Sequence, residues 1–236
     1  MIGRTWHDVW QAKGEANPVV SRGSADVLDR LMEMNGYFSP TSTRELSDHE
    51  VQLRYVVDAL AIRPDESVYE VGCGAGALLY WLSDKCATVG GCDFAPALLK
   101  QARAALPDTA ELDEREADSL DVLPEYDVVV SNGVFIYFPD EDYARRTLDL
   151  MIAKARRAIG VLDVNDAALR DEAEAVRRAR QASRPERYDG LNQLYLDVGF
   201  FEDAARRHGL RCRIERSTTP RSDNARFRYH VSLFKD

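Results

Sequence analysis

The residues of this sequence that are best placed to do chemistry form a short glycine-rich segment, "SVYEVGCGAGALLYWL". Gly72, Gly74 and Gly76 follow a run that reads as a β-strand and open a run that reads as a helix. Glycine has no Cβ, so its backbone adopts unusual dihedral angles and lets a ligand approach closely. The first N–H groups of a helix have no partner within it, so they are free to meet that ligand. The segment is therefore predicted to be a cofactor-binding turn.

The pattern by itself fits two cofactor classes. The letters "GCGAGA" match G-x-G-x-x-G/A, the dinucleotide fingerprint, and Asp93 lies about where that fingerprint places a ribose-binding acid. Counted from Glu70, the same letters match E-x-G-x-G-x-G shortened by one glycine. Glu70 lies inside an apolar strand, where an ionised side chain is costly unless it is paired. The glycine pattern leaves both interpretations open.

Strand-like and helix-like segments alternate from Ser67 onward, which is typical of a doubly wound parallel sheet in an α/β fold. The alternation ends at about Ala167, and two strand-like runs separated by a turn-rich segment close the chain, which predicts an antiparallel pair. The strands are expected at 67–71, 87–93, 114–118, 126–132, 157–164, 210–216 and 225–234. The helices between them are expected at 75–85, 96–106, 140–155 and 197–209, with a charged helix after Ala167.

The N-terminal part of the chain reads as three helices. Asp8 lies three residues after Thr5, the spacing of a capping box. Trp6 and Trp10, at i and i+4, share one face of the helix that follows. The predicted N-caps of the three helices are Thr5, Ser24 and Ser47.

Composition excludes several classes of function. The formal net charge is -9 and the pI is about 5.1, so the chain repels polyanions and nucleic acid is not an expected partner. No apolar run approaches the roughly 20 residues that span a bilayer, and the N-terminus lacks the apolar core of a signal peptide. The cysteines have neither Cys-x-x-Cys nor zinc-ligand spacing. We therefore expect a cytoplasmic protein with free thiols, no metal and no membrane partner.

Five motifs, taken in order, separate the two cofactor classes. They are "YEVGCGAG", "GGCDFAPALLKQAR", "EADSL", "YDVVVSNGVFIYFPD" and "RRAIGVLDV". Together they resemble the class I S-adenosylmethionine (SAM)-dependent methyltransferases of the small-molecule type, over residues 48–234. That family has a seven-stranded, Rossmann-like mixed sheet whose last strand is antiparallel. The glycine turn follows a long helical segment, and no room is left for a separate substrate domain, so a nicotinamide oxidoreductase is disfavoured.

The resemblance implies SAM as cofactor and S-adenosylhomocysteine (SAH) as its product. It implies that the turn Glu70–Gly76 faces the methionine part, that Asp93 accepts hydrogen bonds from the ribose hydroxyls, and that Phe94 packs beside the adenine. Asp118, followed by Ser119, matches an acid that often lies near the adenine amino group. The residues expected to contact the cofactor are Glu70, Gly72, Cys73, Gly74, Gly76, Asp93, Phe94, Asp118, Ser119, Ser131, Asn132, Tyr37 and Trp10.

The resemblance also suggests how the chain is divided. Residues 1–47 are expected to form a helical lid that folds over SAM, because this segment carries Trp6, His7 and Trp10. Residues 48–236 are expected to form the methyltransferase domain, in which 165–196 serve as a substrate cap.

The acceptor end of the site offers no confident general base. Tyr137 stands where many related enzymes carry a His before "x-P-D", and a phenol with a pKa of about 10 is a poor base at neutral pH. The candidate catalytic residues are Tyr137, His7 and Tyr195. Arg184 or Arg187, in the charged segment "RRARQASRPER", are candidates to face an anionic substrate.

The sequence thus predicts a SAM-dependent methyltransferase of biosynthetic or specialised metabolism, monomeric or homodimeric, that methylates an O or N atom of a small-molecule acceptor. Because the sulfonium of SAM carries its own leaving group, positioning and the exclusion of water can supply most of the acceleration. The alternatives are a nicotinamide oxidoreductase, a SAM-binding protein that catalyses a non-methylating reaction, and a protein methyltransferase. The last would favour an open acidic groove over an aromatic-capped pocket.

Overall fold

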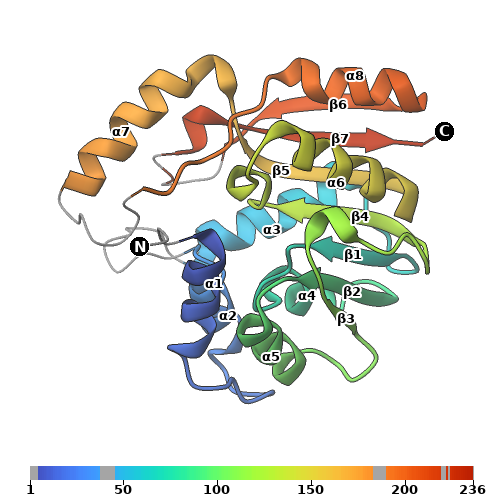
Figure 1. Cartoon of the computed structure of the whole chain (residues 1–236). Coiled ribbons are helices and arrows are strands. Elements are labelled where there is room, and N and C mark those ends of the chain that lie inside the picture. The colour runs from blue at the N-terminus through green and yellow to red at the C-terminus, as the bar shows by residue number, and fades with distance from the viewer. Residues whose placement is uncertain (1–4, 38–45, 183–189, 219–221, 223, 236) are drawn as a thin grey trace.

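The computed structural model describes residues 5–37, 46–182, 190–218, 222 and 224–235. Within these residues, seven strands form one sheet in the order β3-β2-β1-β4-β5-β7-β6 (Figure 1). They are β1 (Ser67–Val71), β2 (Thr88–Asp93), β3 (Glu111–Glu114), β4 (Tyr126–Asn132), β5 (Ala155–Asn165), β6 (Arg211–Arg216) and β7 (Arg228–Phe234). The strands from β3 to β5 pair in parallel, whereas β7 is antiparallel to both β5 and β6. The predicted α/β class and the antiparallel last strand are confirmed.

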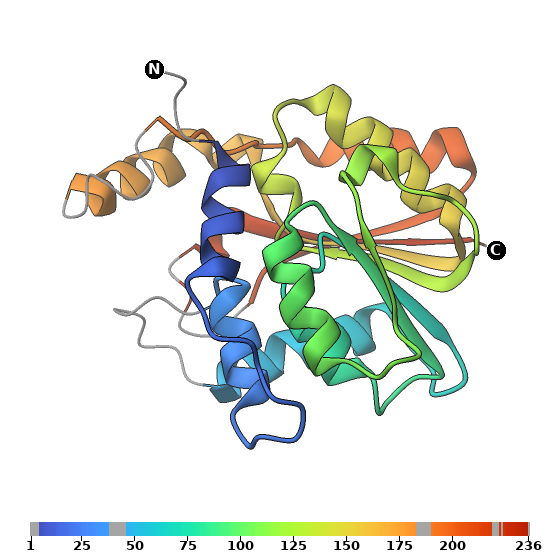
Figure 2. The same ribbon diagram turned by 60° about the horizontal axis from the view of Figure 1, so that its bottom comes forward.

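Helices cover both faces of the sheet (Figure 2). Val128 and Val130 of β4 belong to the core beneath α3, α4 and α5, whereas Val129 belongs to the core beneath α6 and α8. This alternation follows from the two-residue period of a strand. The helices are α1 (Trp6–Glu15), α2 (Val27–Met34), α3 (Leu46–Leu60), α4 (Ala77–Leu82), α5 (Pro96–Ala105), α6 (Glu141–Lys154), α7 (Arg170–Ala182) and α8 (Val198–His208).

The position of the edge strand β3 differs from the prediction. A strand is expected at 114–118, but β3 ends at Glu114, and the chain then turns into a short 3-10 helix, η1 (Ala117–Ser119). The letters of β3 are "ELDE", with one apolar side chain, so the hydrophobic pattern that identifies a strand is weak there. The earlier end of the strand changes which acidic side chain follows it.

The start of α1 is predicted correctly, whereas the starts of α2 and α3 are not. The side chain of Thr5 accepts from the N–H of Asp8 at 3.2 Å, and the Asp8 carboxylate accepts from the N–H of Thr5 at 2.7 Å, which completes the capping box. The N-cap of α2 is Asp26, to which the Ser24 hydroxyl donates at 2.7 Å. Helix α3 begins at Leu46, one residue before the predicted cap Ser47.

Helices α1 and α7 lie beyond the carboxyl ends of β1 and β4 (Figure 1). A Cβ added at Gly14 of α1 would lie 2.6 Å from the carbonyl carbon of Ala97 in α5, so this close packing of the two helices requires glycine. Among the described residues, no helix is long and apolar enough to cross a bilayer.

Candidate active site

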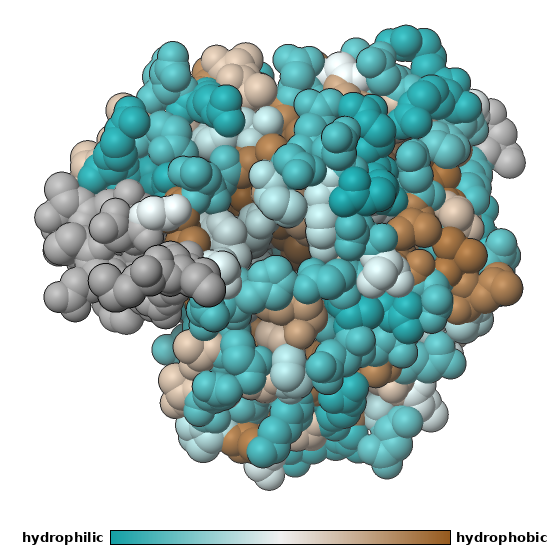
Figure 3. All heavy atoms as spheres, viewed as in Figure 1, coloured by the Kyte–Doolittle hydropathy of each residue, from teal (hydrophilic) through white to brown (hydrophobic). Residues whose placement is uncertain are grey.

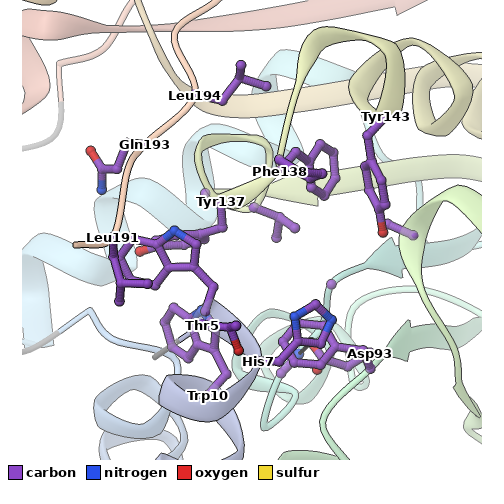
Figure 4. A pocket seen from close by; sticks show the side chains of 18 of the residues that line it. Thr5, His7, Trp10, Asp93, Tyr137, Phe138, Tyr143, Leu191, Gln193 and Leu194 are labelled. Atoms are coloured by element: carbon purple, nitrogen blue, oxygen red, sulfur yellow. Dashed lines mark hydrogen bonds between the residues drawn. The ribbon is translucent and has the colours of Figure 1, made fainter. Parts of the chain in front are cut away.

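A cavity of about 910 Å³ lies where β1, β2 and β4 end, between the turns after these strands, α1 and the segment that follows α7. Figure 3 shows apolar atoms recessed near the middle of this face of the molecule. In Figure 4, Asp93 and His7 lie at one end of the cavity and Leu191 and Gln193 at the other, with Tyr137 between them. These are called the Asp93 end and the Leu191 end.

The glycine-rich turn between β1 and α4 forms part of the wall. Gly72, Gly74 and Gly76 have φ values of 75°, 55° and 82°, a region that side chains with a Cβ rarely adopt. The carbonyl of Cys92 in β2 accepts from the N–H groups of Gly72 and Cys73 at 2.8 and 2.9 Å. The turn is therefore tied to the neighbouring strand as well as to its own.

Asn35, just after α2, clamps the same turn. Its Oδ1 accepts from the N–H of Ala75 at 2.6 Å, and its Nδ2 donates to the carbonyl of Cys73 at 3.0 Å. A Cβ at Gly74 would lie 2.6 Å from Asn35 Oδ1, so the clamp depends on glycine there. No local sequence pattern indicates Asn35, because its partners lie about forty residues away in the sequence, on an element that only the fold brings near.

Asp93, at the carboxyl end of β2, holds the turn and lines the cavity. Its two carboxylate oxygens accept from the N–H groups of Gly74 and Ala95, each at 2.8 Å. Burial raises the pKa of Asp93 to about 6, although the two hydrogen bonds act in the opposite direction. A carboxylate offers about four acceptor positions. Asp93 can therefore accept from ligand hydroxyls while it holds the turn.

Glu70 lies in β1, directly below the turn. It is 2% exposed, and among the described residues its Oε2 has no hydrogen-bond partner. Burial, and then the Asp93 carboxylate, raise the pKa of Glu70 well above its usual range. A buried polar atom without a partner is costly.

Glu116, two residues after β3, supplies a second carboxylate at the Asp93 end. Its Oε1 lies 2.7 Å from His7 Nε2, and its Oε2 accepts from the hydroxyl of Tyr143 at 3.1 Å. The His7 ring packs on Phe94, with ring centroids 4.1 Å apart. A planar ligand at this end would therefore meet both an aromatic face and a hydrogen-bonding carboxylate.

Asp118 lies in η1 and does not line the cavity. Its carboxylate accepts instead from the guanidinium of Arg146 in α6, at 2.9 Å. The turn of η1 separates the Glu116 side chain from that of Asp118, so the structure places Glu116 at the Asp93 end and corrects the placement predicted for Asp118. Because β3 ends at Glu114, the first acidic residue after the strand is Glu116. A correct prediction of that strand end would have indicated Glu116.

Helix α1 closes the cavity between its two ends. Trp6 and Trp10 both pack edge-on against Tyr137, with ring centroids 4.6 and 5.2 Å apart, so they share a face as their spacing predicts. Trp6 Nε1 also donates to the carbonyl of Asn192 at 2.8 Å, which joins α1 to the segment after α7. Two parts of the chain far apart in sequence thus roof one cavity.

Tyr195 lies at the Leu191 end, where its hydroxyl donates to Glu174 at 2.9 Å. Burial, and then this hydrogen bond, raise the pKa of Tyr195 to about 12. The phenol is therefore protonated at neutral pH and serves as a donor to Glu174.

Most of the predicted site residues line the cavity, and the others lie beneath or beside it. Asn132, the last residue of β4, donates to the hydroxyl of Tyr37 at 2.6 Å, which ties the end of that strand to the residues after α2. The lining residues among those predicted are His7, Trp10, Tyr37, Gly72, Gly74, Asp93, Phe94, Asn132, Tyr137 and Tyr195. Those outside the lining are Glu70, Cys73, Gly76, Asp118, Ser119 and Ser131.

The strand order and the roofed cavity together define a Rossmann-like enzyme that binds a nucleoside cofactor across the carboxyl ends of its strands. Residues 68–160 match a family model described as a methyltransferase domain. The chain therefore carries a class I methyltransferase domain that uses SAM and forms SAH.

Solved structures with this fold have low sequence identity to the chain. The magnesium protoporphyrin IX methyltransferase of Synechocystis PCC 6803, with bound SAH, is 15% identical, with a TM-score of 0.63, over 89% of this chain and 93% of its own. The N-methyltransferase NodS of Bradyrhizobium japonicum WM9, in complex with SAH, is 15% identical, with a TM-score of 0.57, over 84% and 89%. A SAM-dependent methyltransferase of Mesorhizobium loti is 19% identical, with a TM-score of 0.58, over 80% and 98%. No curated protein matches the sequence significantly. These structures support the fold, and the chemistry must be argued from the residues.

The residues of the Asp93 end suit SAM, which is cationic at its sulfur and its amino group. The carboxylates of Asp93 and Glu116 lie along this wall, and Glu70 lies beneath it. Phe94 adds an aromatic surface for the adenine. The site therefore fits the cofactor on both charge and shape.

The affinity for SAM should fall as the pH drops through about 6, the pKa to which burial raises Asp93. Below that pH Asp93 is protonated and neutral in the free protein, so binding that requires its carboxylate must release a proton. The dissociation constant should rise by up to about tenfold per pH unit. Calorimetric titration of SAM between pH 5 and pH 8 checks this, with Asp93→Asn as the control that loses the pH dependence. An equally steep profile in Asp93→Asn would assign the titration to another group.

Glu116→Gln should weaken SAM binding, whereas Asp118→Asn should leave it within about twofold of the wild type. Loss of one hydrogen bond to a charged group costs about 1.5 kcal/mol or more, which corresponds to about tenfold in affinity. Both variants remove one negative charge from the same short segment, so each controls for the other. A larger effect in Asp118→Asn would return the adenine contact to the residue that the sequence predicts.

Proposed function

We propose that the protein transfers the methyl group of SAM to an O or N atom of a small-molecule acceptor in biosynthetic or specialised metabolism. Residues 1–47 act as the lid in this proposal, and 165–196 as the acceptor cap. The Asp93 end binds the cofactor, and the Leu191 end receives the acceptor.

The roof over the cavity is the observation that carries the proposal. The bond from Trp6 to the Asn192 carbonyl, and the packing of Trp6 and Trp10 on Tyr137, cover the middle of the cavity. A protein substrate needs an open groove for an extended segment of chain, whereas a small molecule needs an enclosed pocket. The volume of about 910 Å³ lies near the upper end of the range for small-molecule sites, which leaves room for an acceptor beside the cofactor.

The chain's contribution to catalysis is positioning and the exclusion of water. When bound, SAM supplies a methyl group whose C–S bond breaks, with its electron pair left on sulfur, as the acceptor's lone pair forms the new bond. Asp93, held by two backbone N–H groups, fixes the cofactor end, while Trp6 and Trp10 exclude water above the reacting atoms. Alignment of the two reactants in a dry site can account for most of a methyl transfer.

Tyr137 acts in this proposal as a wall of the reaction centre. Its ring packs against Trp6 and Trp10 and lines the middle of the cavity. An ordinary phenol has a pKa of about 10, so at neutral pH it donates a hydrogen bond more readily than it accepts a proton. An amine acceptor needs only its neutral lone pair, and its methylated product leaves as the protonated amine. A hydroxyl acceptor reacts as the oxyanion that it forms in solution, after its proton has passed to water.

Formation of SAH in the presence of a small-molecule panel tests the proposed function. We expect calorimetric titration to show binding of SAM and SAH but not of NADH, and mass spectrometry to show acceptors that have gained one methyl group. SAH formed only when proteins are added would favour the protein methyltransferase, and SAM consumed without any methylated product would favour a non-methylating reaction. Binding of NADH without binding of SAM would refute the assignment.

Tyr137→Phe should reduce turnover by less than about tenfold, because it keeps the ring and removes one orienting hydrogen bond. A general base typically contributes about 10²–10⁴-fold. Turnover and SAM affinity are measured together, with Phe135→Leu, at the start of the same short turn, as a control for damage to packing. A loss of about a thousandfold with unchanged SAM affinity would make Tyr137 the base.

A further inference from the structure

The Leu191 end of the cavity carries a cation that the proposed function does not use. Arg170, the first residue of α7, lines the cavity with an exposed side chain. Its guanidinium lies over the ring of Tyr195, with Cζ 5.3 Å from the ring centroid. Within the part of the chain that the structure describes, no carboxylate forms an ion pair with Arg170. Its N–H donors are therefore available to a ligand.

Glu174, which lines the cavity one helical turn after Arg170, is already neutralised. Glu174 Oε1 accepts from Arg177 Nε at 3.1 Å and from the hydroxyl of Tyr195 at 2.9 Å. Arg177 Nη1 also donates to the carbonyl of Leu191 at 2.8 Å. Because the charge of Glu174 is compensated by Arg177, the positive charge of Arg170 is left uncompensated at this end.

Arg115, the other arginine in the cavity wall, is bound differently. Its guanidinium lies 2.7 Å from the carboxylate of Asp121 and also donates to the carbonyl of Ser119 at 3.1 Å. Arg115 is therefore held by the protein itself, and Arg170 is the better placed of the two to bind an anion.

Tyr195 gives Arg170 a rigid platform. Its side chain packs with Ala173 and Phe227, the whole residue is 8% exposed, and its hydroxyl is held by Glu174. A guanidinium stacked on such a ring keeps its plane, so its N–H groups form a fork of fixed orientation. That fork matches the oxygens of a carboxylate or a phosphate.

The platform is also tied to the reaction centre. The N–H of Leu194, next to Tyr195, donates to the carbonyl of Ile136 at 2.9 Å, and Ile136 precedes Tyr137. A molecule that spans from Arg170 toward Tyr137 would therefore meet two parts of the wall whose relative positions are set by a backbone hydrogen bond.

We propose that the methyl acceptor carries an oxyanion, a carboxylate or a phosphate, which Arg170 binds at the Leu191 end while the nucleophilic O or N lies nearer Tyr137. This inference rests on the proposed function. The net charge of -9 repels an anion from the chain as a whole, so a guanidinium inside the cavity both attracts and orients such an acceptor. Arg184 and Arg187, the arginines that the sequence suggests for an anionic substrate, lie outside the described residues.

The test compares matched anionic and neutral probes on the SAH-loaded protein. The probes are benzoate, phenylacetate and 4-hydroxybenzoate, each with its primary amide, and phenyl phosphate with phenol, with dissociation constants from saturation-transfer difference NMR. At least one oxyanion should bind about tenfold or more tightly than its neutral partner, as expected for a charge-assisted contact. The carboxylate and phosphate arms show which oxyanion Arg170 prefers.

Arg170→Gln should abolish that preference and leave the binding of the amides unchanged. Arg178→Gln is the matched control, since it removes the same charge from an exposed position of α7 that does not line the cavity. Arg170→Lys should restore part of the preference, because the charge is kept and the planar fork is lost. No preference in the wild type, or an unchanged preference in Arg170→Gln, overturns the inference.

Calorimetric titration of SAH separates this inference from the proposed function. All four proteins should bind SAH equally, because Arg170 and Arg178 lie away from the Asp93 end. Normal SAH binding without a preference for oxyanions refutes the acceptor class alone, whereas absence of SAH binding in the wild type refutes the proposed function.

Discussion

The hydrogen bonds of the Asp93 carboxylate are the interaction on which the site depends. One oxygen accepts from Gly74 in the turn after β1, and the other from Ala95 at the start of α5, so one side chain fixes the turns after two neighbouring strands. Glycine residues at positive φ have a large conformational entropy to lose, and a turn made of them needs such external anchors. Asn35 supplies the second anchor from α2. Burial raises the pKa of Asp93 to about 6, which makes this central contact sensitive to pH.

Closure of the cavity is achieved by elements outside the sheet. Trp6 and Trp10 reach over the strand ends from α1, and the segment after α7 meets them through the Asn192 carbonyl. The capping box at Thr5 starts α1 where its tryptophans must act. In the proposed function, the sheet and its turns hold the cofactor, while α1 and the segment after α7 limit which acceptor can enter. This division explains how one fold can serve many acceptors.

The outline of the fold could be predicted from the sequence, because the signals are local and strong. The glycine turn, the alternation of apolar strands with amphipathic helices and the terminal strand pair each lie within short windows. The end of β3 could not, since a short edge strand with one apolar side chain has a weak pattern, and the misplaced end led to Asp118 in place of Glu116. Glu116 and Asp118 are close in sequence, and the conformation of the 3-10 helix η1 decides which of the two side chains faces the cavity.

The sequence by itself indicated the class of the protein, because five motifs in order, from the glycine turn onward, resemble those of the class I SAM-dependent methyltransferases. It also determined the acid at the end of β2, since that residue's neighbours along the chain define its place. Only the tertiary structure decided the roles of Asn35, Glu116 and Arg170. Each contacts a partner that is distant in sequence. Such contacts leave no pattern in the neighbouring residues, so a local sequence signal cannot indicate them. The roof formed by Trp6 and Asn192 is of the same kind, because a contact between residues so far apart in sequence exists only once the sheet has brought α1 and the segment after α7 to the same edge.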